Sequence, residues 1–199
     1  MLDCMSSNPI AKSLGYAALT LTLGAAVPGR AQTAGTPIDA TLFTTYGLYG
    51  QYVSWIVCGY TQATGGCYSS GELGPFVTVG ALLEGDPFTK GDTVTRAIYV
   101  LDTGGSSVLL YVYKKQDTVT SEDDTVNVTL IKTVTLPLTG GSNASCSMAA
   151  NKELLFIGTD QSTQAAEVKK SDLSVAQIGG FSEPLPVTAI TADSTATLL

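Results

Sequence analysis

The sequence predicts an all-β protein of two to three propeller-blade-like antiparallel sheets, arranged as a partial propeller or a sandwich, with a helix only in a signal peptide. Two observations carry this prediction. Short runs rich in Val, Ile, Thr and Tyr recur after residue 97, and turns that contain Gly, Asn and Asp separate them, as is typical of antiparallel strands. After residue 40 the sequence contains no amphipathic helical pattern.

The strand-rich part contains one unit twice. The segment YVYKK at residues 111–115 aligns with AEVKK at 166–170, and SMAA at 147–150 aligns with ITAD at 190–193. Units of about 97–143 and 144–193 would each hold three or four strands, which is the scale of a propeller blade. The first copy is longer, which predicts an exposed, dispensable loop at residues 116–125. The final run, residues 187–192, alternates like a strand and is expected to be paired.

The first 31 residues have the pattern of a secretory signal peptide. Lys12 precedes an apolar run at residues 13–27, and small residues precede a cleavage position after Ala31. The run is shorter than the roughly 20 apolar residues of a membrane-spanning helix. We therefore expect a secreted or periplasmic protein with a flexible leader at 32–40, a single β domain at 41–199 and no membrane span in the mature chain.

Composition excludes several classes of partner and site. Loss of Asp3, Lys12 and Arg30 with the signal peptide would leave 16 acidic and eight basic residues, a net charge of −8. An acidic surface disfavours nucleic acid, because phosphates require Lys and Arg. The chain has no His, which removes Ser-His and Cys-His nucleophilic sites and the common zinc sites that use His.

Three cysteines remain after cleavage. Cys58 and Cys67 are nine residues apart with three glycines between them, so the loop can turn back on itself. Secretion permits a disulfide between them, and free buried thiols are the alternative. Cys146 lies in an alternating run and is expected to be a buried, inert thiol.

Aromatic residues crowd the segment 43–60. Tyr49, Tyr52 and Trp55 could form an exposed platform that stacks on a sugar, within a region that extends to Tyr68. The competing interpretation places the same rings in the core, where most aromatic side chains lie.

Carboxylates supply the remaining candidates for catalysis and metal binding. Two acids are sufficient for a glycosidase, and five are candidates: Glu72, Glu84, Asp86, Asp92 and Asp102. Most of them lie among turn signals, where Asp and Glu usually make local hydrogen bonds. Calcium is the one cofactor considered, at residues 84–86 or 121–124, and neither segment has the spacing of a calcium loop.

Part of the sequence resembles a family of small secreted bacterial proteins. The resemblance is carried by CGYT at 58–61, GCYSSG at 66–71, LGPF at 73–76 and GALLEG at 80–85, followed by SMAANK at 147–152 and AITAD at 189–193. It implies secretion and no particular activity. A looser resemblance to secreted propeller repeats covers residues 97–193.

These features favour a secreted, non-enzymatic β-repeat protein that acts as an interaction or structural module of the cell envelope. Its partner would be itself or another envelope protein. A glycan-binding module that uses residues 46–68 is the first alternative, and a carboxylate-based hydrolase is the second. The sequence assigns no catalytic residue and no metal ligand.

Overall fold

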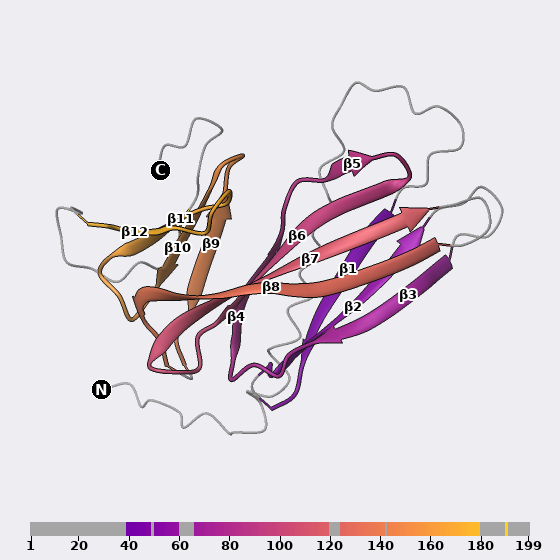
Figure 1. The fold of residues 1–199 in the computed structure, drawn as a ribbon. Helices are drawn as coiled ribbons and strands as arrows, with labels where there is room; N and C mark the ends of the chain where they lie inside the picture. The colour runs from indigo at the N-terminus through magenta and orange to yellow at the C-terminus, as the bar shows by residue number, and fades with distance from the viewer. Residues whose placement is uncertain are drawn as a thin grey trace, which may run out of the picture. The chain divides into compact units, whose positions relative to one another are not determined.

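A computed structural model describes residues 39–48, 50–59, 66–119, 124–141, 143–179 and 190. The chain divides into two compact units, the first ending at Pro75 and the second beginning at Phe76. The described elements are β-strands in three antiparallel sheets, and no helix occurs among them (Figure 1). The predicted all-β class with two to three antiparallel sheets is confirmed.

Sheet A makes up the first unit and has the order β1-β2-β3, with β1 at Asp39–Tyr46, β2 at Tyr52–Gly59 and β3 at Gly66–Leu73. One face of this sheet is apolar and buried. Phe43 on β1 pairs with Trp55 on β2, and both side chains are buried together with Val53, Val57 and Leu73. Alternation along a strand sends the neighbouring residues to the other face.

Sheet B has the order β4-β6-β7-β8, and the short β5 also pairs with β6. Its strands are β4 at Val79–Glu84, β5 at Phe88–Lys90, β6 at Thr93–Asp102, β7 at Ser107–Val119 and β8 at Asp124–Thr139. The turn at residues 103–106 joins β6 to β7, as the Gly-Gly pair predicts. Strand β8 is 16 residues long and forms one edge of the sheet.

Sheet C has the order β12-β11-β10-β9, so its consecutive strands form a meander. Its strands are β9 at Cys146–Ala150, β10 at Leu154–Thr159, β11 at Ala165–Lys169 and β12 at Val175–Ile178. The sequence-based boundary at 143/144 lies between β8 and β9.

Sheets B and C share the core of the second unit. Leu101, Leu110 and Leu136 from sheet B pack with Leu155 and Ile157 from sheet C, and all five are at most 2% exposed. Apolar burial of this kind contributes roughly 25 cal/mol per Å². The opposite face of sheet B is also buried, because Ile98, Val100 and Tyr113 are at most 8% exposed.

Two local predictions are wrong. Gly71, Gly74 and Pro75 are typical turn residues and predict a turn over residues 67–75. Gly66–Leu73 is instead a strand, because pairing with β2 overrides the weak local preference. The predicted loop at 116–125 is mostly a hairpin stem: Gln116 pairs with Asn127, and Asp117 is buried at 1% exposure.

Several predictions lie outside the described residues. These include the signal peptide, residues 32–38 of the leader, the acidic residues 121–123 and most of the run 187–192. Residues 39 and 40 of the predicted leader form the start of β1. In the described part of the chain, no helix is long and apolar enough to cross a bilayer.

Candidate functional site

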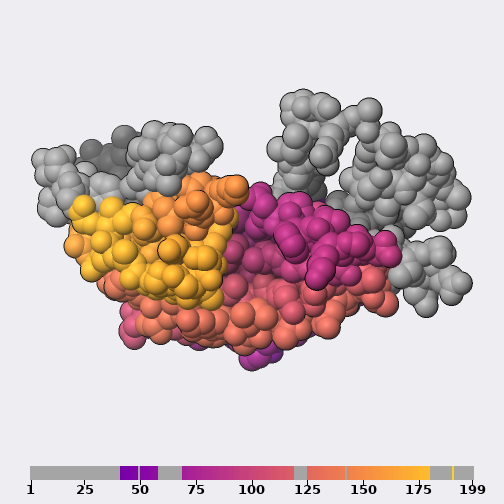
Figure 2. All heavy atoms as spheres, turned by 45° about the horizontal axis from the view of Figure 1, so that its top comes forward, coloured from indigo at the N-terminus to yellow at the C-terminus, as the bar shows by residue number. Residues whose placement is uncertain are grey.

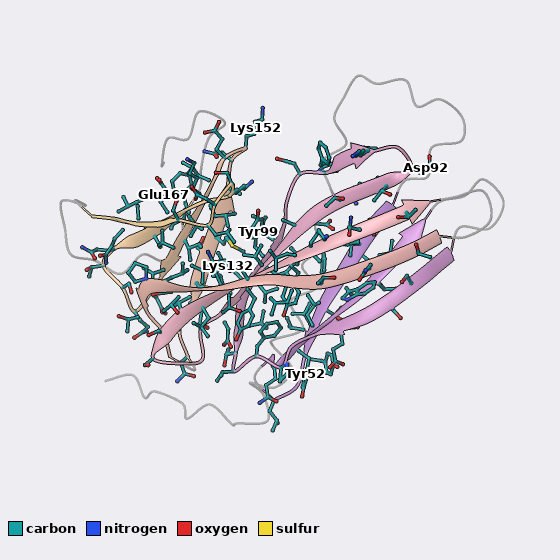
Figure 3. All side chains as sticks on the ribbon, viewed as in Figure 1. Tyr52, Asp92, Tyr99, Lys132, Lys152 and Glu167 are labelled. Atoms are coloured by element: carbon teal, nitrogen blue, oxygen red, sulfur yellow. The ribbon has the colours of Figure 1, made fainter. Side chains whose placement is uncertain are left out.

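A cluster of polar and aromatic side chains lies at the β1–β2 turn of sheet A. The Tyr46 and Tyr52 rings are stacked with centroids 5.3 Å apart and planes 20° apart, and the Tyr46 hydroxyl donates a hydrogen bond to Glu72 Oε2 on β3. Tyr46 is 44% exposed and Tyr52 is half-buried; Figure 3 shows Tyr52 at one end of its sheet. We call Tyr46, Tyr52 and Glu72 the tyrosine cluster.

The structure does not bring the three predicted platform residues together. Trp55 lies three residues after Tyr52 on the same strand, so the two side chains project from opposite faces. Trp55 is 6% exposed and packs over Gly71, where an added Cβ would come within 2.4 Å of the indole. Tyr49 lies outside the described residues. Tyr52 therefore shares its exposed face with Tyr46.

The charge of Glu72 controls the ionisation of Tyr46. The hydrogen bond to this carboxylate favours the neutral phenol and raises the pKa of Tyr46 to about 12. The hydroxyl therefore stays protonated across the physiological range, and the exposed cluster combines an apolar ring surface with carboxylate oxygens that can accept hydrogen bonds.

The second candidate surface is the outer edge of β8. Among the described strands, β8 pairs with β7 alone, so the other side of its backbone is an edge. Residues 129–133 are all exposed, including Leu130 at 48% and Ile131 at 55%. Salmon-coloured atoms of this part of the chain lie on the surface in Figure 2. A long, exposed edge strand is a template for pairing with another strand.

The two halves of β8 differ in how well this edge is protected. Residues 131–139, which we call the closed half, contain three features that hinder pairing: a bulge at Ile131, the charge of Lys132 (labelled in Figure 3) and Pro137. Three side chains also cap its end: Gln177 donates to the Pro137 carbonyl, Thr159 donates to the Thr139 carbonyl, and Ser162 Oγ accepts from the Thr139 amide at 2.7 Å.

Residues 125–130, which we call the open half, have none of these protective features. Their sequence, TVNVTL, contains no charge and no proline. Thr125, Asn127, Thr129 and Leu130 are exposed, whereas Val126 and Val128 are half-buried. The open half therefore presents a short, uncharged stretch of β-strand edge.

A buried group of charges lies on β7 and its neighbours. Lys115 Nζ is 3.0 Å from Asp117 Oδ2 and 3.4 Å from Glu84 Oε1, and Arg96 Nη1 is 3.5 Å from the same Asp117 oxygen. The Lys115 and Asp117 side chains are at most 1% exposed. The two positive and two negative charges balance, so the group neutralises itself inside the unit.

The candidate acids are scattered rather than gathered in one cleft. Glu72 belongs to the tyrosine cluster, Glu84 contacts Lys115, and Asp86 and Asp92 are exposed. Asp102 is buried and accepts hydrogen bonds from the amides of Val77, Thr78 and Gly104, which fix the chain around it. Within the described residues, no group of three or more Cys, Asp or Glu side chains could hold a metal ion.

The three cysteines after residue 31 lie on three different strands. Cys58 and Cys67 are cross-strand partners in the β2–β3 pairing. Cys146 on β9 is half-buried, next to Gly80, and burial together with the charge of Asp160 raises the pKa of its thiol to about 12. A thiol with this pKa is protonated at neutral pH and is a poor nucleophile.

Sequence reasoning found these surfaces only in part. Tyr46 was in the predicted aromatic region, but the partner role of Glu72 depends on the β2–β3 pairing, which the sequence did not predict. The residue pattern predicts a strand at 126–138, within β8, whereas the edge position of β8 follows from the strand order.

In comparisons with known proteins, no family model, no curated protein and no solved structure matches this chain.

Proposed function

We propose that this chain is a secreted, non-enzymatic interaction module of the cell envelope that binds its partner by strand pairing. One observation carries the proposal: among the described strands β8 is an edge strand, and its residues 125–130 carry no charge and no proline, with four of the six side chains exposed. Main-chain hydrogen bonds at such an edge supply affinity, and alternate side chains supply specificity.

The contrast between the two halves of β8 supports this role. Natural edge strands are usually blunted by charges, prolines or bulges, and the closed half of β8 has all three. Because only the closed half is protected, a defined segment of six residues remains available to a partner. In the proposed blade-like unit, β8 is the last strand, and the last strand of a blade has a neighbour on one side only.

The proposal that the protein is secreted rests on two features. One is the signal-peptide pattern of residues 1–31, and the other is a disulfide that we propose between Cys58 and Cys67. Directly opposite residues in an antiparallel pair have Cα atoms about 4.5–5.5 Å apart, which lies within the range of disulfides. Their pairing across β2 and β3 supports the bond. In unreduced, unfolded mature protein, a thiol reagent should modify one cysteine of three; modification of all three would contradict the disulfide.

A photo-crosslinking side chain at residue 129, in the cell that makes the protein, tests the interaction role. The open half should give a specific adduct in the envelope fraction after irradiation. The same side chain at residue 133, which is exposed in the closed half, is the matched control and should give little adduct. Absence of an adduct at residue 129 would contradict the proposed function.

Glycan binding is a second candidate function, and the tyrosine cluster favours it. Exposed aromatic rings beside a carboxylate offer a sugar both a stacking surface and hydrogen-bond acceptors. On a glycan array, Tyr52→Ala should abolish binding, while Thr44→Ala, an exposed change on β1 of the same sheet, should not. No signal from the unmodified protein would exclude this candidate.

A further inference from the structure

We propose that the open half of β8 pairs with the same segment of a second copy of this chain, as two antiparallel strands related by a two-fold axis. The inference rests on the proposed function and names the partner of that edge. Such an interface is isologous, because the same patch serves on both copies. It would join two copies of sheet B into one continuous sheet.

The charge distribution favours a second copy over a charged partner strand. The chain carries a net charge of −7, but residues 125–130 carry none. Two open halves therefore bring no like charges opposite each other at the edge. The remaining repulsion comes from the rest of the acidic surface, and salt screens it with a Debye length of about 8 Å at 0.15 M.

The side chains of one open half are also compatible with those of a second open half. Thr125, Val126, Val128 and Thr129 are β-branched and favour extended backbone. An axis at Val128 places the exposed Asn127 of one copy opposite the exposed Thr129 of the other, and Thr129 opposite Asn127. Polar pairs of this type across two antiparallel strands each contribute roughly 0.2–1 kcal/mol.

The size of the open half determines how strong the self-association is expected to be. Stable protein interfaces bury roughly 1,200–2,000 Å² in total, and six residues of edge strand bury less than this. Self-association should therefore be weak and dependent on concentration, and it should become stronger as salt screens the acidic surface.

Sedimentation velocity over a range of protein and salt concentrations tests the inference. The unmodified protein should shift from monomer towards dimer as either concentration rises. Thr129→Lys, which places two lysines diagonally across the axis on the same face of the sheet, should weaken self-association by on the order of tenfold. Thr133→Lys makes the same change at an exposed position of the closed half and should leave it unchanged. Mixing Thr129→Lys with Thr129→Glu should restore pairing as a heterodimer.

A monomer at every concentration, or a Thr129→Lys variant that dimerises like the unmodified protein, would overturn the inference. The crosslinking experiment separates this failure from that of the proposed function. An adduct at residue 129 with twice the mass of the chain supports the second copy. An adduct of any other mass overturns the second copy but keeps the interaction role, and no adduct overturns both.

Discussion

At the scale of single residues, the structure contains a lysine and an aspartate that are buried two positions apart on β7. Lys115 lies between Asp117 and Glu84, while Asp117 also contacts Arg96. Removal of charges from water is costly, and mutual attraction offsets that cost only while every partner is present. Loss of one member should therefore be far more harmful than loss of an exposed ion pair.

Lys115→Met should destabilise the protein by about 3–5 kcal/mol, because it leaves the carboxylate of Asp117 buried without its closest cation. Urea unfolding measures the change. Lys169→Met is the matched control: Lys169 is 56% exposed and 3.9 Å from Asp172, so its loss should cost less than about 0.5 kcal/mol. Equal effects of the two substitutions would contradict the burial of this charge group.

The tyrosine cluster gives a pH-dependent prediction. The Glu72 carboxylate favours the protonated phenol, so Glu72→Gln should lower the pKa of Tyr46 from about 12 towards the ordinary value near 10. Carbon NMR of labelled tyrosine over pH 8–12.5 follows this ionisation. Tyr113, whose pKa burial raises to about 12, is the internal control and should not move. An unchanged Tyr46 would mean that the contact with Glu72 does not form in solution.

At the scale of elements, sheet A contains a glycine that makes room for an aromatic side chain on the neighbouring strand. Trp55 on β2 pairs with Gly71 on β3, and the indole occupies the space that a side chain at position 71 would fill. Gly71 weakens the local preference for a strand, yet it leaves room for the indole against the backbone of β3. The same residue that made β3 hard to predict is therefore required for its packing.

Gly71→Ala should destabilise the first unit by about 1–3 kcal/mol, since a Cβ there would clash with Trp55. Trp55 is the only tryptophan, so its fluorescence during urea unfolding reports on this unit directly. Gly141→Ala is the control, because no atom lies within 4 Å of a Cβ at that position. A stable Gly71→Ala variant with unchanged fluorescence would show that the indole does not cover the glycine.

The elements of the second unit were more predictable than those of the first. Residues 98–102, 108–115 and 154–158 are continuous apolar or alternating runs, and each lies in a strand. Gly66–Leu73 is polar and rich in glycine, so only its pairing with β2 makes it a strand. Asp117 was predicted in an exposed loop because residues 116–125 are the insertion that makes the first copy longer. It is buried beside Lys115 and Arg96, and a local pattern does not reveal the β6–β7 pairing that brings Arg96 there.

At the scale of the whole molecule, the proposed function depends on the order of the strands, which the sequence pattern does not reveal. The composition of β8 could be read from the sequence, but whether residues 125–130 are central or at an edge depends on which strands lie beside them. The predicted platform fails to assemble for a related reason: the every-third spacing of Tyr52 and Trp55 sends them to opposite faces once the segment is a strand.

Hydrogen–deuterium exchange of the backbone amides of β8 is a direct test of the proposed pairing at the open half. Edge amides exchange readily until another strand covers them. Between dilute and concentrated protein, the amides of residues 125–130 that point away from β7 should become protected, while those of residues 131–139 should keep their rates. Exchange at residues 125–130 that stays the same at every concentration, or protection spread evenly along β8, would contradict the account.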